Sequence, residues 1–215
     1  MGRIIKDIFI LFAITLVAGL ALGFVFNITK EPREIQEQKT INKAYAKVMP
    51  GVKNTKEVKL PSDLKTKITK KIKADEKANN VTPINEFNAD ISYVVKATND
   101  KCEEIGHIVT VTDNEAYGGS LTMTVGIDSE KKVLGVSFLS LAETPGLGMN
   151  ADNDSFKKQF KNKQVPYFVY TKTGAKADNE IDAISSATVT TNAVTHGVNA
   201  AIACVNFLEG GEGNE

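Results

Sequence analysis

The first long pattern in the chain is an uncharged, almost wholly apolar run at positions 8–26, IFILFAITLVAGLALGFVF, in which Thr15 is the one polar side chain. A helix of these 19 residues would span about 28 Å at about 1.5 Å per residue, which is close to the hydrocarbon thickness of a bilayer. A core helix of a soluble domain would carry a polar stripe. The pattern therefore predicts a transmembrane anchor over residues 8–28.

The charges beside this run indicate its direction in the membrane. Arg3 and Lys6 precede it, whereas the basic residues that follow it are each paired with a nearby glutamate. A short basic N-terminus before an apolar run is typical of a signal-anchor, and a cleaved signal peptide is the alternative. We expect a single pass through the cell (inner or plasma) membrane, with residues 1–7 in the cytoplasm and everything after Lys30 on the outer side.

Residues 29–83 show a weaker pattern. Apolar residues at helical spacing over 31–49 predict a juxtamembrane helix that ends at Pro50 and Gly51. The stretch 53–77 is rich in lysine and has few large apolar residues, which predicts a solvated, partly irregular linker; a basic binding patch is the alternative.

From about residue 84 the period of the pattern changes to two. Apolar and polar residues alternate at 91–95, 108–112, 120–127 and 133–139, and each segment is predicted as a strand. Asp128, Ser129 and Glu130 separate the last two segments, which predicts a hairpin.

The remaining elements are two helices and a strand. A short helix is expected over 155–163, a strand over 167–170, and a long helix from about Val189 to Leu208 with one buried face. The fold class is α+β: one N-terminal transmembrane helix, followed by a single extracytoplasmic domain at 84–215 with antiparallel strands and a C-terminal helix.

Composition removes several classes of function. The 26 basic and 26 acidic residues balance, and tryptophan is absent, so no nucleic-acid partner is indicated. Cys102 and Cys204 form no CxxC pair and His107 and His196 stand alone in the sequence, so no metal site is expected. The two cysteines fit either one disulfide or two separate thiols.

One segment suggests a specific chemistry. Residues 182–188, DAISSAT, place small hydroxyl and methyl side chains just before the last helix. The start of a helix carries unpaired N–H groups and positive potential, which suit a phosphate. A plain Ser/Thr helix cap is the alternative.

This segment resembles the flavinylation sequence Asp-x-x-Ser/Thr-Gly-Ala-Thr, which a dedicated FMN transferase reads. The resemblance implies that Thr188 carries FMN through a phosphoester, and that Asp182, Ser185, Ser186 and Ala187 belong to the cofactor-binding site. Ser186 stands where the pattern has glycine. If that position needs a positive φ, serine costs some stability there.

A second segment, ETPGLG at 143–148, extends the resemblance. Together with Tyr117-Gly118-Gly119 before it and SSAT after it, it is similar to the ordered motif set of the FMN-binding domain in two related proteins, the G subunit of the Rnf electron-transport complex and the C subunit of the sodium-translocating NADH:quinone oxidoreductase. Family members often have histidine two residues before this glutamate. Leu141 stands there, so no histidine role is carried over.

The resemblance also implies which residues contact the cofactor and what the protein does. Glu143 and Thr144 would offer hydrogen bonds to FMN, whereas Gly146, Leu147 and Gly148, with Tyr117, would lie against its ring. No catalytic residue is expected, since no acid–base or nucleophile–base pair is visible. The implied function is electron relay within a membrane-bound ferredoxin:NAD oxidoreductase complex with other subunits, coupled to ion translocation. The alternatives are a membrane-anchored flavin reductase and a flavin-binding sensor module.

Overall fold

The computed structural model describes residues 2–82 and 84–210. Its internal contacts divide the chain into two units, 1–42 and 43–215. The first unit consists of helix α1 (Gly2–Val48) up to residue 42, and its apolar side chains are exposed, as in Leu22 at 72%. The helix continues through Pro32, so the predicted anchor and juxtamembrane helix are one element that ends just before Pro50. It is long and apolar enough to cross a membrane once.

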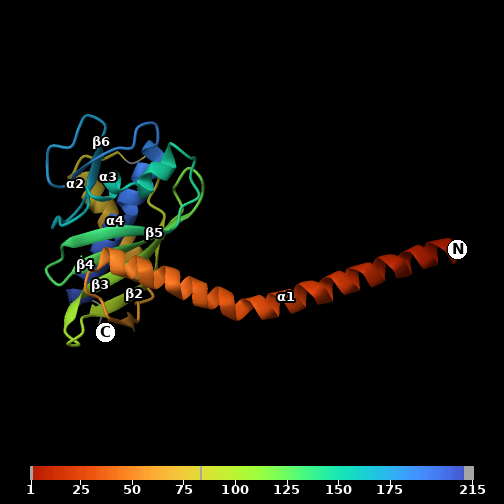
Figure 1. The fold of residues 1–215 in the computed structure, drawn as a ribbon. Helices are drawn as coiled ribbons and strands as arrows, with labels where there is room; N and C mark the ends of the chain where they lie inside the picture. Colours follow the sequence, from red (N-terminus) through yellow and green to blue (C-terminus); the bar gives the residue numbers. More distant parts are fainter. Residues whose placement is uncertain (1, 83, 211–215) are drawn as a thin grey trace. The chain divides into compact units, whose positions relative to one another are not determined.

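The second unit is built on an antiparallel sheet of five strands in the order β1-β2-β3-β4-β5 (Figure 1). The strands are β1 (Asn54–Val58), β2 (Ala89–Thr98), β3 (Glu104–Asp113), β4 (Leu121–Asp128) and β5 (Val133–Ser140). Two further strands, β6 (Val169–Thr171) and β7 (Glu180–Asp182), pair in parallel. The helices are α2 (Leu64–Ala78), the 3-10 turn η1 (Gly148–Asp152), α3 (Asp154–Lys157) and α4 (Thr188–Glu209).

The predicted hairpin is confirmed in β4 and β5, where Val125 pairs with Val136. Its turn is held by the Asp128 carboxylate, which accepts hydrogen bonds from the N–H groups of Glu130 and Lys132 at 3.0 and 2.8 Å. Lys131 takes a left-handed φ of 65° in this turn. Aspartate is common at the first position of such turns because its side chain can accept these backbone N–H groups.

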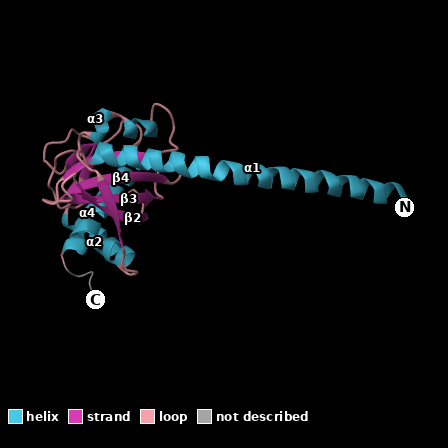
Figure 2. Cartoon of the chain, turned by 60° about the horizontal axis from the view of Figure 1, so that its bottom comes forward, coloured by secondary structure: helices cyan, strands magenta, loops and turns pink. Residues whose placement is uncertain are grey.

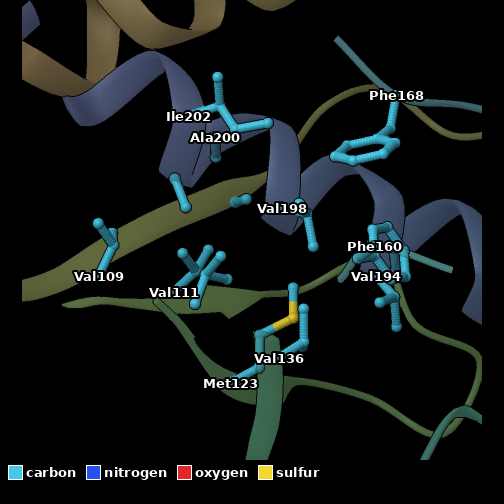
Figure 3. Packing of buried hydrophobic residues seen from close by; sticks show 14 of the residues in the cluster. Val109, Val111, Met123, Val136, Phe160, Phe168, Val194, Val198, Ala200 and Ile202 are labelled. Carbon is cyan, nitrogen blue, oxygen red and sulfur yellow. The ribbon is translucent and has the colours of Figure 1, made fainter. Parts of the chain in front are cut away.

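Helix α4 packs on one face of the sheet, and α2 packs beside α4 on the same side (Figure 2). In Figure 3, Val198 of α4 points toward Met123 of β4, with Phe160 and Phe168 filling the core nearby. The prediction of a single buried face on α4 was too narrow. Every residue from Thr190 to Val205 is buried, because the sheet, α2 and the loops around β6 enclose the helix.

The other face of the sheet receives the last turn of α1. A Cβ on Gly126 would overlap the carbonyl oxygen of Val48, whereas a Cβ on the cross-strand partner Gly135 would lie 3.5 Å from the Val48 Cα. Glycine at these positions lets the helix backbone approach the strands closely. Val48 is fully buried, so α1 ends inside the second unit.

The prediction of an irregular linker at 53–77 was wrong for most of that stretch. Asn54–Val58 is strand β1, and α2 buries Leu64, Ile68 and Ile72 in the core. The apolar residues are few, but they recur at four-residue spacing, so they form one stripe while the lysines occupy the exposed face. The compact unit therefore begins at Lys43 and not at residue 84.

The short helix expected over 155–163 is also shorter in the structure. Helix α3 covers only Asp154–Lys157, and turns follow it. The spacing of Phe156 and Phe160 still brings their rings together, edge to face at 5.7 Å. The strand expected at 167–170 is β6, shifted by about two residues. The α+β class, with its antiparallel sheet and C-terminal helix, is confirmed.

Candidate functional site

Three segments that are far apart in the sequence meet at one end of the sheet. The pairing of Asp113 with Leu121 and of Thr122 with Ser140 brings the loop between β3 and β4 next to the loop that follows β5. The start of α4 joins them, because that helix lies along the same face of the sheet. These segments carry all three sequence motifs.

They enclose a pocket of about 410 Å³. A volume of this size is typical of small-molecule sites. Its walls are formed by Tyr117, Glu143, Thr144, Leu147, Gly148, Ser186, Ala187, Thr188, Val189 and Thr190. Eight of these ten residues were predicted as cofactor contacts from the sequence.

Glu143 is the polar centre of the pocket wall. Its Oε1 accepts a hydrogen bond from the Thr190 hydroxyl at 2.9 Å and another from the Gly118 N–H at 3.2 Å. The side chain is only 8% exposed, so these bonds replace the water that its carboxylate has lost. One carboxylate thereby connects α4, the loop after β5 and the loop between β3 and β4.

Gly148 permits this arrangement. A Cβ there would overlap the Glu143 carboxylate and would lie 2.7 Å from the Thr190 Oγ1. Any larger residue would push apart the two groups that form the hydrogen bond. The second glycine of the ETPGLG motif is thus explained by close packing on Glu143.

Helix α4 begins at Thr188, which is partly exposed to the pocket. The turn before it is fixed by the buried Thr191 hydroxyl, which accepts the Ile184 N–H and donates to the Ala187 carbonyl, both at 3.0 Å. Ser186 has a φ of 59°, so the position does require the left-handed conformation that glycine adopts most easily. The first N–H groups of a helix have no partner within it, and Thr188, Val189 and Thr190 of this first turn line the pocket.

Apolar side chains also line the pocket, and two of them are well exposed. Leu147 is 40% exposed and Tyr117 is 76% exposed, although both are large side chains that would normally be covered. Val189 adds a third apolar surface. The pocket lining therefore combines hydroxyl groups at the helix start with exposed apolar surface from Leu147 and Tyr117.

Three predicted site residues lie outside the pocket wall. Gly146 is in the turn before η1, with a φ of 78°, and its carbonyl accepts the Asn150 side-chain N–H at 2.8 Å. Asp182 ends β7, and its carboxylate accepts the Ala175 N–H at 2.6 Å, so it fixes the neighbouring loop. Ser185 is exposed beside the pocket.

Comparison with known proteins agrees with these features. A family model described as an FMN-binding domain matches residues 116–203. The chain is 31% identical over 197 residues to the G subunit of the Na(+)-translocating ferredoxin:NAD(+) oxidoreductase complex of Acetobacterium woodii, and the alignment covers 90% of this chain and 87% of that protein. The chain belongs to this G-subunit family.

A second member of the G-subunit family, from the proton-translocating complex of Clostridium ljungdahlii, is 38% identical over 104 residues. That alignment covers 48% of this chain and 56% of the Clostridium protein, so the chain spans little more than half the length of this relative. The crystal structure of the C subunit of Na(+)-translocating NADH-quinone reductase from Parabacteroides distasonis has the same fold, with a TM-score of 0.52 at 18% identity over 82% of this chain and 95% of that one.

The sequence did not predict the positions of two groups of residues in or near the pocket. Val189 and Thr190 line the pocket beside Thr188, and the hydroxyl-rich start of the helix was a signal for the second of them. His196 was expected to be isolated, but it contacts Glu115, which lies 81 residues away in the sequence. No local spacing reveals such a contact.

The other sequence expectations concern metals and thiols. Among residues 2–82 and 84–210, no group of three or more histidine, cysteine or acidic side chains is arranged to hold a metal ion. Cys102 is exposed and Cys204 is buried, and both are free thiols. Burial raises the pKa of the Cys204 thiol to about 12, so it stays protonated and unreactive at neutral pH.

Proposed function

We propose that this chain carries FMN covalently on Thr188 and relays electrons as the G subunit of a membrane-bound ferredoxin:NAD oxidoreductase complex that translocates ions. The observation that carries the proposal is the position of Thr188. It is the first residue of α4 and lines the pocket, so a phosphate on its hydroxyl lies at the helix start. Helix N-termini favour phosphate through their free N–H groups and dipole.

The pocket suits the two ends of FMN. Ser186, Ala187 and Thr188 surround the polar end, where the phosphate and ribityl hydroxyls would be held. Leu147 and Tyr117 offer apolar surface for the flat ring, while Glu143 and Thr144 offer acceptors and a hydroxyl for its polar edge. The ring would cover Leu147 and Tyr117, and exposed apolar surface of this kind is typical of a ligand-binding groove.

The lining residues point to an electron carrier. When bound, FMN supplies one- and two-electron transfer. Of the residues that line the pocket, only Tyr117 and Glu143 can ionise, and the Glu143 carboxylate is engaged by Thr190 and Gly118. The chain would therefore position the flavin and exclude water from its phosphate end, and it would depend on partners to supply and remove electrons.

The covalent bond requires a maturation enzyme. We infer that an FMN transferase brings a flavin phosphoanhydride, whose riboflavin-phosphoryl group passes to the Thr188 oxygen as the P–O bond of the anhydride breaks, while the hydroxyl proton leaves with the displaced phosphate monoester. Asp182 and Ser185 are both exposed, so the enzyme can reach them. Their role would be recognition by the transferase.

The proposal also includes the direction in which α1 crosses the membrane. The short basic N-terminus favours residues 1–7 in the cytoplasm and the FMN unit on the other side of the membrane. Free FMN is scarce outside the cytoplasm, so a covalent link would prevent loss of the cofactor there. The relatives named above are subunits of multi-subunit complexes, which supports other membrane and peripheral subunits as partners.

A mass spectrum of the C-terminal tryptic peptide tests the covalent link. The protein is co-expressed with an FMN transferase and digested, and peptide 177–215 is measured. We expect its mass to rise by that of FMN less one water, with fragment ions that place the addition on Thr188. An unmodified peptide from a culture in which a known flavinylated protein is modified would refute the proposal.

Purification of the tagged chain from native membranes tests the role in a complex. The proposal expects several multi-span proteins in stoichiometric amounts. A lone flavoprotein that reduces a soluble acceptor would support the reductase alternative, and a lone flavoprotein with no such activity would support the sensor.

A further inference from the structure

A buried cluster of ionisable side chains lies beside the pocket, and no role described so far uses it. The His196 Nδ1 is 2.9 Å from the Glu115 Oε2, and the His196 Nε2 is 3.1 Å from the Glu76 Oε1. All three residues are at most 8% exposed. Each ring nitrogen lies close to a carboxylate oxygen, so a doubly protonated imidazole places its charge between the two; the contact with Glu115 is a hydrogen bond, whereas the contact with Glu76 is an ion pair, because the Glu76 Oε1 has no hydrogen-bond partner among the described residues.

The cluster connects the pocket loop to the helix that begins at the pocket. Glu115 lies two residues before Tyr117, and its carboxylate also accepts the Asn192 side-chain N–H at 3.0 Å. Thr188, Asn192 and His196 occupy successive turns on one face of α4. Glu115 further accepts the Asn88 N–H at 2.6 Å, so the segment before β2 is held as well.

The charges around the cluster require a proton on the imidazole. Besides Glu76 of α2 and Glu115, Asp113 at the end of β3 interacts with the imidazole, and Tyr167 before β6 and Asp75 of α2 lie near the cluster. Asp113 is fully buried, its Oδ1 accepts the Glu115 N–H at 2.8 Å, and its Oδ2 has no hydrogen-bond partner among the described residues. An excess of buried negative charge would be unstable without a cation at its centre.

The pKa values of the two central groups agree with this arrangement. Burial lowers the pKa of His196, but the hydrogen bonds and charges of Glu115 and Glu76 outweigh burial and raise it to about 9. Burial and the charge of Glu115 raise the pKa of Asp113 to about 8. At neutral pH His196 is therefore protonated on both ring nitrogens and positively charged, and Asp113 is protonated and neutral.

We propose that protonated His196 is a positioning residue for the pocket: by holding Glu115, it fixes the Tyr117–Gly118 wall against helix α4. Gly118 in turn donates its N–H to Glu143, so a shift of this wall would reach the centre of the pocket. The inference rests on the proposed function only in identifying the pocket as the flavin site.

Hydrogen exchange of the full-length protein in detergent tests this inference, with protection measured for the amides of residues 114–120. Wild type is compared with His196→Gln and with His107→Gln as a matched control. His107 is also buried and lies 3.4 Å from a carboxylate oxygen of Glu209, but it contacts the last residue of α4, at the opposite end of that helix. We expect protection at 114–120 to fall about tenfold or more in His196→Gln at pH 7, and to stay within about twofold of wild type in His107→Gln.

A titration of the wild type provides a second readout that does not depend on a variant folding. Protection at 114–120 should fall as pH rises through about 8 and 9, where Asp113 and then His196 lose protons, while residues 104–108 keep theirs; the part of the fall that is absent in His196→Gln belongs to His196. Equal losses in the two variants, or unchanged protection at 114–120 up to pH 10, would overturn the role of His196.

A flavin readout separates this inference from the proposed function. In the loaded protein, His196→Gln should change the visible circular dichroism of the flavin, and His107→Gln should leave it unchanged; equal spectra from all three proteins would count against His196. If the wild type takes up no flavin, the proposed function fails, while the exchange measurements still decide whether His196 fixes the loop.

Discussion

The hydroxyl of Thr190 donates a 2.9 Å hydrogen bond to the carboxylate of Glu143, and both side chains are buried. The bond joins the second residue after the proposed FMN acceptor to the first residue of the ETPGLG loop. It therefore fixes the distance between the phosphate end of the pocket and the loop that would carry the ring.

Replacing Thr190 by valine removes this donor while keeping the side-chain shape. Because the buried Glu143 carboxylate then retains only the Gly118 N–H on that oxygen, we expect a loss of about 1–3 kcal/mol in the free energy of unfolding, measured in urea at pH 7. Thr195→Val is the control, because its hydroxyl donates to the Thr191 carbonyl within the same helix. Equal losses of unfolding free energy in the two variants would show that the hydrogen bond to Glu143 stabilises the fold no more than a hydrogen bond within the helix does.

Thr188→Ala should abolish covalent flavin. On a denaturing gel viewed under ultraviolet light, the wild type co-expressed with the transferase should give a fluorescent band near 23.3 kDa, and the variant should give none. Thr195→Ala should keep the band, since Thr195 is buried about two turns further along α4 and its hydroxyl donates only within that helix, to the Thr191 carbonyl. A fluorescent Thr188→Ala band would exclude Thr188 as the acceptor.

The sequence predicts best those parts of the fold that depend on local pattern. The hairpin of β4 and β5 and the start of α4 follow from alternation, helical spacing and turn chemistry within a few residues. The ordered motifs also identify most of the pocket wall, since each motif lies at the end of a strand or helix. The lysine-rich stretch misleads because three large apolar residues in α2 suffice to pack it, although charged residues dominate its composition.

Other features could not be predicted, because they depend on contacts between distant residues. His196 meets Glu76 and Glu115 only after the sheet brings α2 and the loop after β3 to α4. The approach of Val48 to Gly126 likewise depends on how α1 ends on the sheet. A single sequence contains no signal for either pair.

The glycine pair on β4 and β5 provides a test of that approach. Gly126→Ala should lower the free energy of unfolding by about 1–3 kcal/mol, because its Cβ would overlap the backbone of Val48. Gly135→Ala should change it by less than about 1 kcal/mol, since its Cβ would meet the Val48 Cα at an ordinary 3.5 Å. Urea unfolding of both variants measures the difference, and a larger loss at Gly135 would contradict this packing.

Two adjacent serines should respond to glycine in opposite directions. Ser186 has a φ of 59°, so Ser186→Gly relieves strain and should raise the free energy of unfolding by up to about 1 kcal/mol. Ser185 is not among the residues with positive φ, so Ser185→Gly should lower it by about 0.5–1 kcal/mol through the greater entropy of the unfolded chain. Thermal unfolding of the flavin-free protein measures both changes. A stability loss in Ser186→Gly would show that the serine side chain matters more than the backbone strain.

Stability should fall as pH rises above neutrality, and His196 should account for much of the fall. The folded-state pKa of His196, about 9, lies above the ordinary value of 6.5, so its contribution is complete below about pH 6.5 and is lost as pH rises through 9. Asp113 acts in the same direction, since its pKa is raised to about 8 and the buried carboxyl becomes charged as pH rises toward that value. Wild type should therefore lose on the order of 5 kcal/mol in the free energy of unfolding between pH 6.5 and 9.5, about 3 kcal/mol of it from His196.

His196→Gln separates the two contributions, because glutamine has no proton to lose in this range. Its unfolding free energy, measured in urea at intervals from pH 6.5 to 9.5, should be lower than that of wild type at pH 6.5 and should approach the wild-type value near pH 9.5. The slope that remains belongs to Asp113, which keeps its place between Glu115 and the core. Parallel curves for the two proteins would mean that the imidazole is neutral in the folded state, and that Glu76 and Glu115 are held together by some other cation or by protons of their own.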